Sequence, residues 1–228
     1  MCSRSLRHAC YGERKCFPKS PEPFSLGVDK LNMTGYIKGM PQVNVKEKLV
    51  KYAEEVFRQQ GFDGTSVQDI TDAAGVPKGS FYNHFDSKQS LAAEIVRRYY
   101  QATDLSDLVA PGAPLDRLRA HFLKQIKRTE QTGFAYGCLL GTFAAEVTTA
   151  GEKVKAAVHD GLASWTAAVA AVIAEAQARG EVSSRYSSQE LAAYMIDAFE
   201  GTALRIKVTG DPAILAHFLD ITLSVLSL

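Results

Sequence analysis

Residues 66–85 constrain the fold more than any other segment, because their sequence fits two short helices joined by a tight turn. Ser66 is a residue type that caps a helix N-terminus, and Asp69 follows three positions later, where a carboxylate favours the first helical turn. Gly75 supplies the backbone freedom for a sharp turn, and Pro77 suits the first position of a second helix. The segment therefore predicts a helix-turn-helix whose second helix begins at Pro77 or the residue after it.

The second helix has an apolar side and a polar side. Phe81 and Phe85 are four residues apart and form an aromatic anchor on one face. Such a helix presents polar residues near its N-terminus to the DNA major groove, where lysine pairs with guanine or phosphate and asparagine with adenine. The expected recognition residues are Lys78, Gly79, Ser80, Tyr82, Asn83 and His84. The expected phosphate contacts are Thr65, Ser66 and Lys88. The alternative is that the aromatics are ordinary core and the polar residues an ordinary solvated face.

Three strings extend this pattern: Phe57–Phe62, Thr65–Ile70 and Val76–Leu91. Together they resemble the tetracycline-repressor (TetR) family of bacterial transcription regulators, most strongly over residues 45–98. The resemblance implies an all-α fold, with an N-terminal three-helix domain containing the helix-turn-helix and a C-terminal helical domain for ligand binding and dimerisation. It also implies a cytoplasmic homodimer that binds a double-stranded DNA operator and is released by a small effector.

Two strings in the second half narrow the resemblance. Tyr136–Gly141 and Glu200–Lys207 look like the branch of TetR regulators that respond to reactive electrophiles and small unsaturated acids, such as the acrylate-responsive and N-ethylmaleimide-responsive repressors. Cys138 lies at an expected helix start, where the helix dipole would lower its pKa and make it a target for electrophiles. The alternative for Cys138 is a small buried apolar residue. The candidate effector residues are Cys138, Phe122, Trp165, Tyr194 and Arg205.

Helical periodicity sets the expected elements. A first helix is expected over about 45–60, and a fourth from near Ser87, with Leu91, Ile95 and Tyr99 facing inward. Residues 104–114 are expected to form a loop, because they contain two prolines and a glycine. Further helices are expected at about 115–132, 137–149, 152–179, 187–208 and 212–227. The last two carry apolar stripes that fit either a dimeric four-helix bundle or an intramolecular core.

The expected domains are a disordered extension over 1–42, the DNA-binding domain over 43–98 and the regulatory domain over 99–228. The chain carries a net charge of +1, and residues 43–100 hold eight basic and eight acidic residues. A DNA-binding domain without net charge argues against the DNA-binding prediction, because counterion release favours a basic surface. Specificity for a DNA sequence would then depend on a few hydrogen-bond donors, on lysines that cluster on one side of the domain, and on the second copy of the domain that a dimer supplies.

Other classes of protein are less well supported. The chain contains no glycine-rich phosphate loop, nucleophile elbow or metal-binding helix motif, which argues against an enzyme. We expect no cofactor and no metal site, since the histidines are scattered and Cys2, Cys10 and Cys16 lack the spacing of zinc ligands. We also expect no membrane span, because no apolar stretch reaches about 18 residues. A DNA-binding protein without a small effector remains the alternative function.

Overall fold

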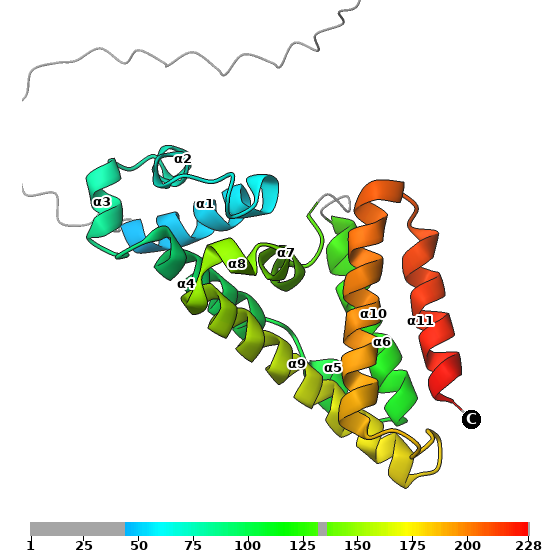
Figure 1. Ribbon diagram of the computed structural model, residues 1–228. Coiled ribbons are helices and arrows are strands. Elements are labelled where there is room, and N and C mark those ends of the chain that lie inside the picture. Colours follow the sequence, from blue (N-terminus) through cyan, green and yellow to red (C-terminus); the bar gives the residue numbers. More distant parts are fainter. Residues whose placement is uncertain (1–43, 132–135, 228) are drawn as a thin grey trace, which may run out of the picture. The chain divides into compact units, whose positions relative to one another are not determined.

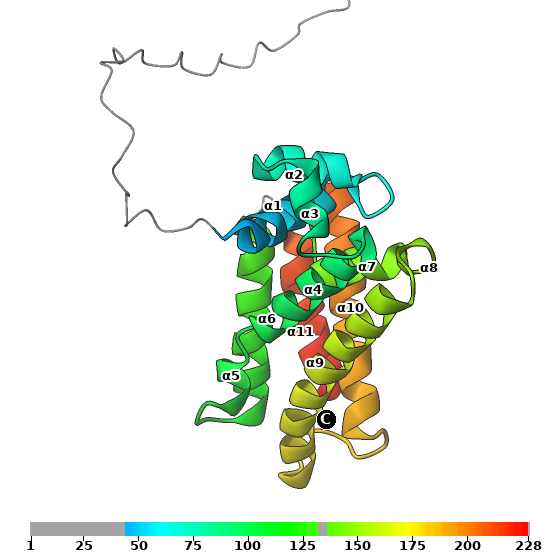
Figure 2. The same cartoon turned by 90° about the vertical axis from the view of Figure 1, so that its left-hand side faces the viewer.

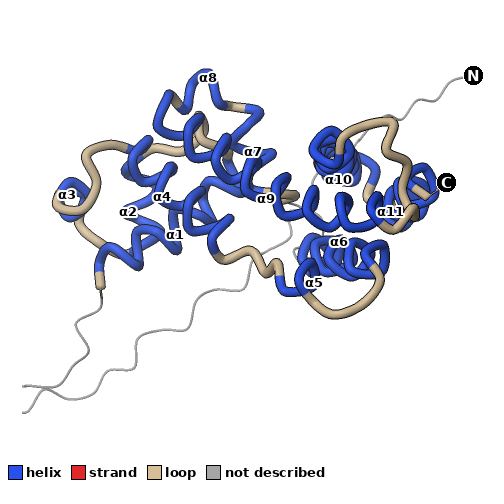
Figure 3. Tube along the Cα trace, turned by 90° about the horizontal axis from the view of Figure 1, so that it is seen from below, coloured by secondary structure: helices blue, strands red, loops and turns tan. Residues whose placement is uncertain are grey.

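The computed structural model describes residues 44–131 and 136–227. Within these ranges every regular element is a helix, and the only strand-like pairing is a bridge between Val182 and Ser227 (Figure 3). The predicted all-α fold class is therefore confirmed. The extension expected over residues 1–42 lies outside the described residues.

Four helices form the N-terminal part, called the head from here on: α1 Val45–Gln60, α2 Val67–Ala74, α3 Lys78–Tyr82 and α4 Lys88–Gln101. The helix-turn-helix has the local chemistry that the sequence predicts. Ser66 and Asp69 form a reciprocal capping box at the start of α2. Gly75 follows α2 with φ 63°, a left-handed conformation that glycine adopts without a steric penalty. Pro77 is the N-cap of α3, so this helix begins at Lys78.

Seven helices follow and form the body: α5 Ser106–Val109, α6 Pro114–Gln131, α7 Leu139–Ala145, α8 Val147–Ala150, α9 Glu152–Ala178, α10 Ser188–Thr209 and α11 Ala213–Leu226. Two details differ from the sequence prediction. The short helix α5 lies inside the expected loop at 104–114. The single helix expected over 137–149 is two short helices, because the chain departs from helical geometry at Glu146, which ends α7 and precedes α8.

Helix α9 connects the head to the body. It runs beside α4 at one end and packs against α6 and α10 at the other (Figure 1). Its 27 residues continue through Asp160 and Glu175, and it is long and apolar enough by composition to cross a membrane. The expectation of no membrane span is not contradicted by this, because it referred to an uninterrupted apolar stretch, and 44% of the apolar window of α9 is buried inside the protein. The apolar residues of α9 serve in packing, because this helix contributes buried side chains to two separate hydrophobic clusters.

The buried apolar side chains form two clusters, and the first is not confined to the head. It joins α1–α4 to α7, α8 and the beginning of α9. Within it, the ring of Phe143 from α7 packs edge-on against Phe57 of α1, with centroids 5.4 Å apart. The second cluster fills the space among α5, α6, α10, α11 and the rest of α9. Figure 2 shows α7 and α8 close to the head, so the body supplies part of the head's own core.

Polar contacts add to this apolar connection between α7 and the head. The Glu146 carboxylate accepts a hydrogen bond from the backbone N–H of Phe62, with N and Oε2 2.6 Å apart. At the other end of α7, the Arg58 guanidinium donates to the carbonyl of Gly137 over 3.5 Å. The head is therefore bound to the residues that flank α7 on both sides.

Replacing Glu146 by alanine tests the contribution of its carboxylate. Glu146→Ala leaves the Phe62 N–H without its acceptor, so we expect the free energy of unfolding to fall by about 1–3 kcal/mol. We also expect faster hydrogen exchange at the Phe62 amide. Urea denaturation and exchange mass spectrometry measure the two effects. Glu55→Ala, an exposed position on α1, serves as control and should change stability by less than about 0.5 kcal/mol. Unchanged protection at Phe62 would contradict the assigned role of Glu146.

Candidate nucleic-acid interface and ligand cavity

Helix α3 presents the polar face that the sequence predicts. Phe81 is fully buried and Phe85 is 6% exposed, so both rings anchor this segment in the head. Tyr82 is 57% exposed, although a tyrosine has enough apolar surface to be buried. The other exposed members of the predicted recognition set are Lys78, Gly79, Asn83 and His84, and Ser80 is half-buried. The backbone positions this row of side chains toward solvent without covering it.

The surroundings of Gly79 show that the fold does not require glycine there. A Cβ atom built on Gly79 would meet no heavy atom within 4 Å. The residue lies in helix α3, where alanine would be the more favourable choice by about 1 kcal/mol. A missing side chain at an exposed helical position leaves room for another molecule to approach the backbone closely. Open space of this kind above a helix backbone is expected where the helix contacts another molecule.

The three predicted phosphate-binding residues have different environments. Ser66 is exposed, and its hydroxyl caps α2. Thr65 is 2% exposed and its hydroxyl donates to the Gly61 carbonyl. Lys88 donates from Nζ to the carbonyls of Phe62 and Thr65, each 2.7 Å away, and burial lowers the pKa of its ammonium. Thr65 and Lys88 thus stabilise the α1–α2 loop from within, and their phosphate contacts stay a prediction that this geometry does not favour.

The ion pairs of the head involve its three arginines and three of its acidic residues. Glu54 pairs with Arg58, while Glu47 and Glu94 pair with Arg98. In the part of the chain that the structure describes, no ion pair involves the lysines of α1 and α3, which are Lys46, Lys48, Lys51 and Lys78. Pairing therefore neutralises the arginines, but it leaves as many acidic side chains as lysines outside the ion pairs, so attraction of a polyanion would depend on where the lysines lie and not on a surplus of positive charge.

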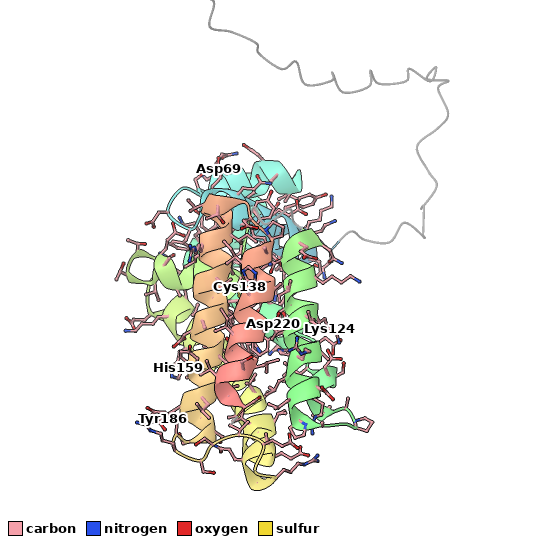
Figure 4. All side chains as sticks on the ribbon, turned by 90° about the vertical axis from the view of Figure 1, so that its right-hand side faces the viewer. Asp69, Lys124, Cys138, His159, Tyr186 and Asp220 are labelled. Carbon is pink, nitrogen blue, oxygen red and sulfur yellow. The ribbon has the colours of Figure 1, made fainter. Side chains whose placement is uncertain are left out.

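A cavity of about 310 Å³ lies where the head meets the body. Its wall draws on α1, α4, α6, α7, α9 and α10, and includes Arg58, Tyr99, Gln125, Cys138, Trp165 and Phe199. The volume is at the lower end of the range for small-molecule sites, and the lining combines aromatic with polar side chains. Along the vertical of Figure 4, Cys138 lies between Asp69 in the head and Tyr186 at the opposite end of the body.

Cys138 is the N-cap of α7 and is half-buried in the cavity wall. Burial raises the pKa of its thiol to about 12, and the nearby Glu200 carboxyl adds to the increase. The expected lowering of this pKa is therefore wrong. The helix dipole is a weak local effect, whereas the loss of water and a neighbouring carboxylate both penalise the thiolate. Burial also raises the pKa of Glu200, to about 6.

The other predicted effector residues divide into three groups. Trp165 lines the cavity together with Cys138. Phe122 is fully buried and lies behind the cavity wall, stacked on Trp165 with centroids 5.9 Å apart. Tyr194 and Arg205 are exposed and do not line this cavity. Local sequence showed which residues are aromatic or charged, but the helix faces that meet are decided by tertiary packing.

Two cavity residues escaped the sequence analysis. Gln125 is 9% exposed, lines the cavity, and has no recorded side-chain hydrogen bond within the described residues. Arg58 reaches the cavity from the head, where it packs on the ring of Tyr99 at 5.2 Å. Neither belongs to a motif, so no local signal identified them.

A buried pair supports the cavity wall from behind. Trp165 donates from its indole nitrogen to Nε2 of His121 over 2.9 Å. Burial lowers the pKa of His121 to about 4, which keeps this imidazole neutral and able to accept near pH 7. Among the residues described, no group of three or more His, Cys, Asp or Glu side chains is arranged to hold a metal ion.

Comparisons with known proteins agree with this architecture. Residues 49–95 match the family described as bacterial regulatory proteins, tetR family, and residues 114–222 match the tetracyclin repressor-like C-terminal domain. The transcriptional repressor DhaR of a Mycobacterium species is 30% identical over 82% of this chain and 94% of its own length. The regulator AcuR of Cereibacter sphaeroides is 31% identical over 81% and 86%.

A solved structure shows the same fold. The regulatory protein TetR from Rhodobacter sphaeroides superimposes with a TM-score of 0.73 at 29% identity, covering 80% of this chain and 98% of its own. Similarity of this extent includes both the helix-turn-helix and the helical body. The chain therefore belongs to the TetR family of bacterial transcriptional regulators and is not an enzyme.

Proposed function

We propose that this protein is a cytoplasmic homodimeric repressor that binds a pseudo-palindromic operator and leaves it when a small effector occupies the cavity beside Cys138. The observation that carries the proposal is the exposed polar face of α3 on a fully packed head. Its recognition residues are Lys78, Gly79, Ser80, Tyr82, Asn83 and His84, with Ser66 as the accessible member of the phosphate-binding set. The name of the similar repressor DhaR supports repression as the output.

Exposed apolar side chains on α10 and α11 support the homodimer. Val208 is 88% exposed and Val225 is 63% exposed, with Ile221 and Leu204 exposed beside them on the same two helices. The intramolecular core uses other faces of these helices, including Phe199 and Phe218. Two copies that pair through α10 and α11 would cover the remaining apolar surface in a four-helix bundle.

The cavity favours an effector-responsive repressor over a DNA-binding protein without a ligand. A wall with aromatic rings, the largely buried amide of Gln125 and one thiol has the composition of a small-molecule site. A protein that served only a structural role on DNA would gain nothing from such a site. Operator binding that no small molecule alters would support that alternative.

Lys78 is the residue whose removal tests the recognition face most directly. Lys78→Ala should weaken binding to DNA from upstream of the protein's own gene by about tenfold, because one donor to a base or phosphate is lost. The salt dependence should also decrease by about one counterion. Fluorescence anisotropy against unrelated DNA measures both. Lys155→Ala removes an exposed lysine from α9 and should leave binding unchanged. Equal affinity of wild type for both DNAs would contradict a sequence-specific repressor.

The raised pKa of Cys138 gives electrophile sensing a distinctive pH dependence. With a pKa of about 12, the thiolate fraction rises about tenfold per pH unit and does not level off near the ordinary value of about 8.5. Alkylation by N-ethylmaleimide between pH 6.5 and 9.5, followed at the Cys138 peptide by mass spectrometry, should show this slope. Cys138→Ser should keep operator binding and lose release by the reagent. Release that persists in Cys138→Ser would reject Cys138 as the sensor.

A further inference from the structure

Two arginines from different helices meet on one aromatic ring in the cavity wall. Arg58 of α1 and Arg128 of α6 both line the cavity. The guanidinium carbon of Arg58 lies 5.2 Å from the ring centroid of Tyr99, and that of Arg128 lies 4.4 Å from it. The face of an aromatic ring attracts cations, so Tyr99 holds both side chains at the cavity. Like charges that share one site disfavour each other, and a nearby anion removes this cost.

The two arginines differ in their partners. Arg58 pairs with Glu54 at 2.9 Å and donates to the carbonyl of Gly137. Among the described residues, the guanidinium of Arg128 has no acidic partner and no hydrogen bond, only the ring of Tyr99. Glu54 is the one acidic residue in the described lining. Two arginines against one glutamate leave the wall with one positive charge.

Helix α6 presents a second polar group beside Arg128. Gln125 precedes Arg128 by three positions, so the two side chains share one face of the helix. Both line the cavity, Gln125 as a largely buried residue and Arg128 as an exposed one, which places Arg128 where the cavity opens to solvent. A planar guanidinium donates two parallel N–H groups to a carboxylate, and a glutamine amide can donate another. This face of α6 therefore has the donors that bind a carboxylate.

Another part of the wall is buried and aromatic. Trp165 of α9 is 8% exposed and Phe199 of α10 is 3% exposed, and their ring centroids lie 5.8 Å apart in edge-to-face contact. Both residues line the cavity, so a flat ring placed there would gain further aromatic contacts. The volume of about 310 Å³ accommodates a single ring with a short side chain, whereas an acid as small as acrylate would leave most of it unfilled.

We propose that the cavity binds an aromatic acid with one negative charge, whose carboxylate meets Arg128 and Gln125 and whose ring lies against Trp165 and Phe199. The inference rests on the proposed function, because it names the chemical class of the effector. A phosphate monoester fits less well, because it carries nearly two negative charges and the wall has one positive charge to offset them. A neutral aromatic molecule would gain the ring contacts and leave Arg128 without an anion.

Phenylacetate is the probe, and its neutral amide, phenylacetamide, is the matched ligand without the charge. Trp165 is the only tryptophan in the chain, so the intrinsic fluorescence of the full-length protein reports occupancy of the cavity. Wild type should bind phenylacetate at least about tenfold more tightly than phenylacetamide, because hydrogen bonds to an ionised group are the stronger kind. Acrylate has the charge without the ring and should bind at least about tenfold more weakly than phenylacetate.

Substitution of Arg128 tests its contact with the carboxylate. Arg128→Gln should weaken phenylacetate binding about tenfold and change the affinity for phenylacetamide by less than about twofold. Arg128→Lys keeps the charge without the paired donors and should retain part of the affinity for the acid. Arg119→Gln is the control on the same helix, because Arg119 pairs with Asp220 and does not line the cavity. A merely structural role of Arg128 would lower the affinities for the acid and the amide alike.

Binding is measured without DNA, so its outcome is separate from that of the proposed function. Equal affinity of wild type for phenylacetate and phenylacetamide would overturn the inference, and so would an Arg128→Gln variant that binds both as wild type does. Acrylate bound as tightly as phenylacetate would overturn the aromatic class. A phenylacetate Kd above about 1 mM would overturn the inference as a whole. Phenylacetate binding that leaves operator affinity unchanged would keep the ligand class in place and reject effector-controlled release.

Discussion

The packing of α7 and α8 against α1 and the α1–α2 loop is the constraint on which the rest of the structure depends. A head of four short helices has little apolar surface to bury, and small units of this kind are only marginally stable alone. Here Phe143 and its neighbours complete the core that Phe57 and Phe62 begin. The hydrogen bond from Phe62 to Glu146 adds a polar contact to that apolar surface. The head is consequently not an independent unit that happens to precede the body.

The helix-turn-helix could be predicted from the sequence because its determinants are local. Ser66 and Asp69 are three residues apart, and the capping box between them needs nothing from elsewhere in the chain. The turn at Gly75 and the buried rings of Phe81 and Phe85 also follow from short-range spacing. Element existence was therefore predictable over most of the described chain, including the long helices α6, α9, α10 and α11.

What could not be predicted depends on contacts between distant segments. The break at Glu146 was missed because the side chain that stabilises it binds an amide in the head. The pKa of Cys138 was predicted with the wrong sign because Glu200, on α10, and the surrounding burial outweigh the local dipole. Lys88 was expected on DNA phosphate, yet Nζ reaches two carbonyls of the α1–α2 loop. In each case the partner comes from a segment far away in the chain, which no local pattern indicates.

The head contacts the body at Phe62 through a backbone amide and not through a side chain. Selection can therefore act separately on operator recognition and on the response to a chemical signal. Within the described chain, the backbone hydrogen bonds of α3 and the residues after it, His84 and Phe85, stay inside that segment, and none of the recognition residues is bound to the body. The side chains proposed to read DNA can therefore diverge while the contacts between the head and the body are retained. A lineage of such proteins could acquire new operators and keep an old chemical signal, or exchange the signal and keep the operator.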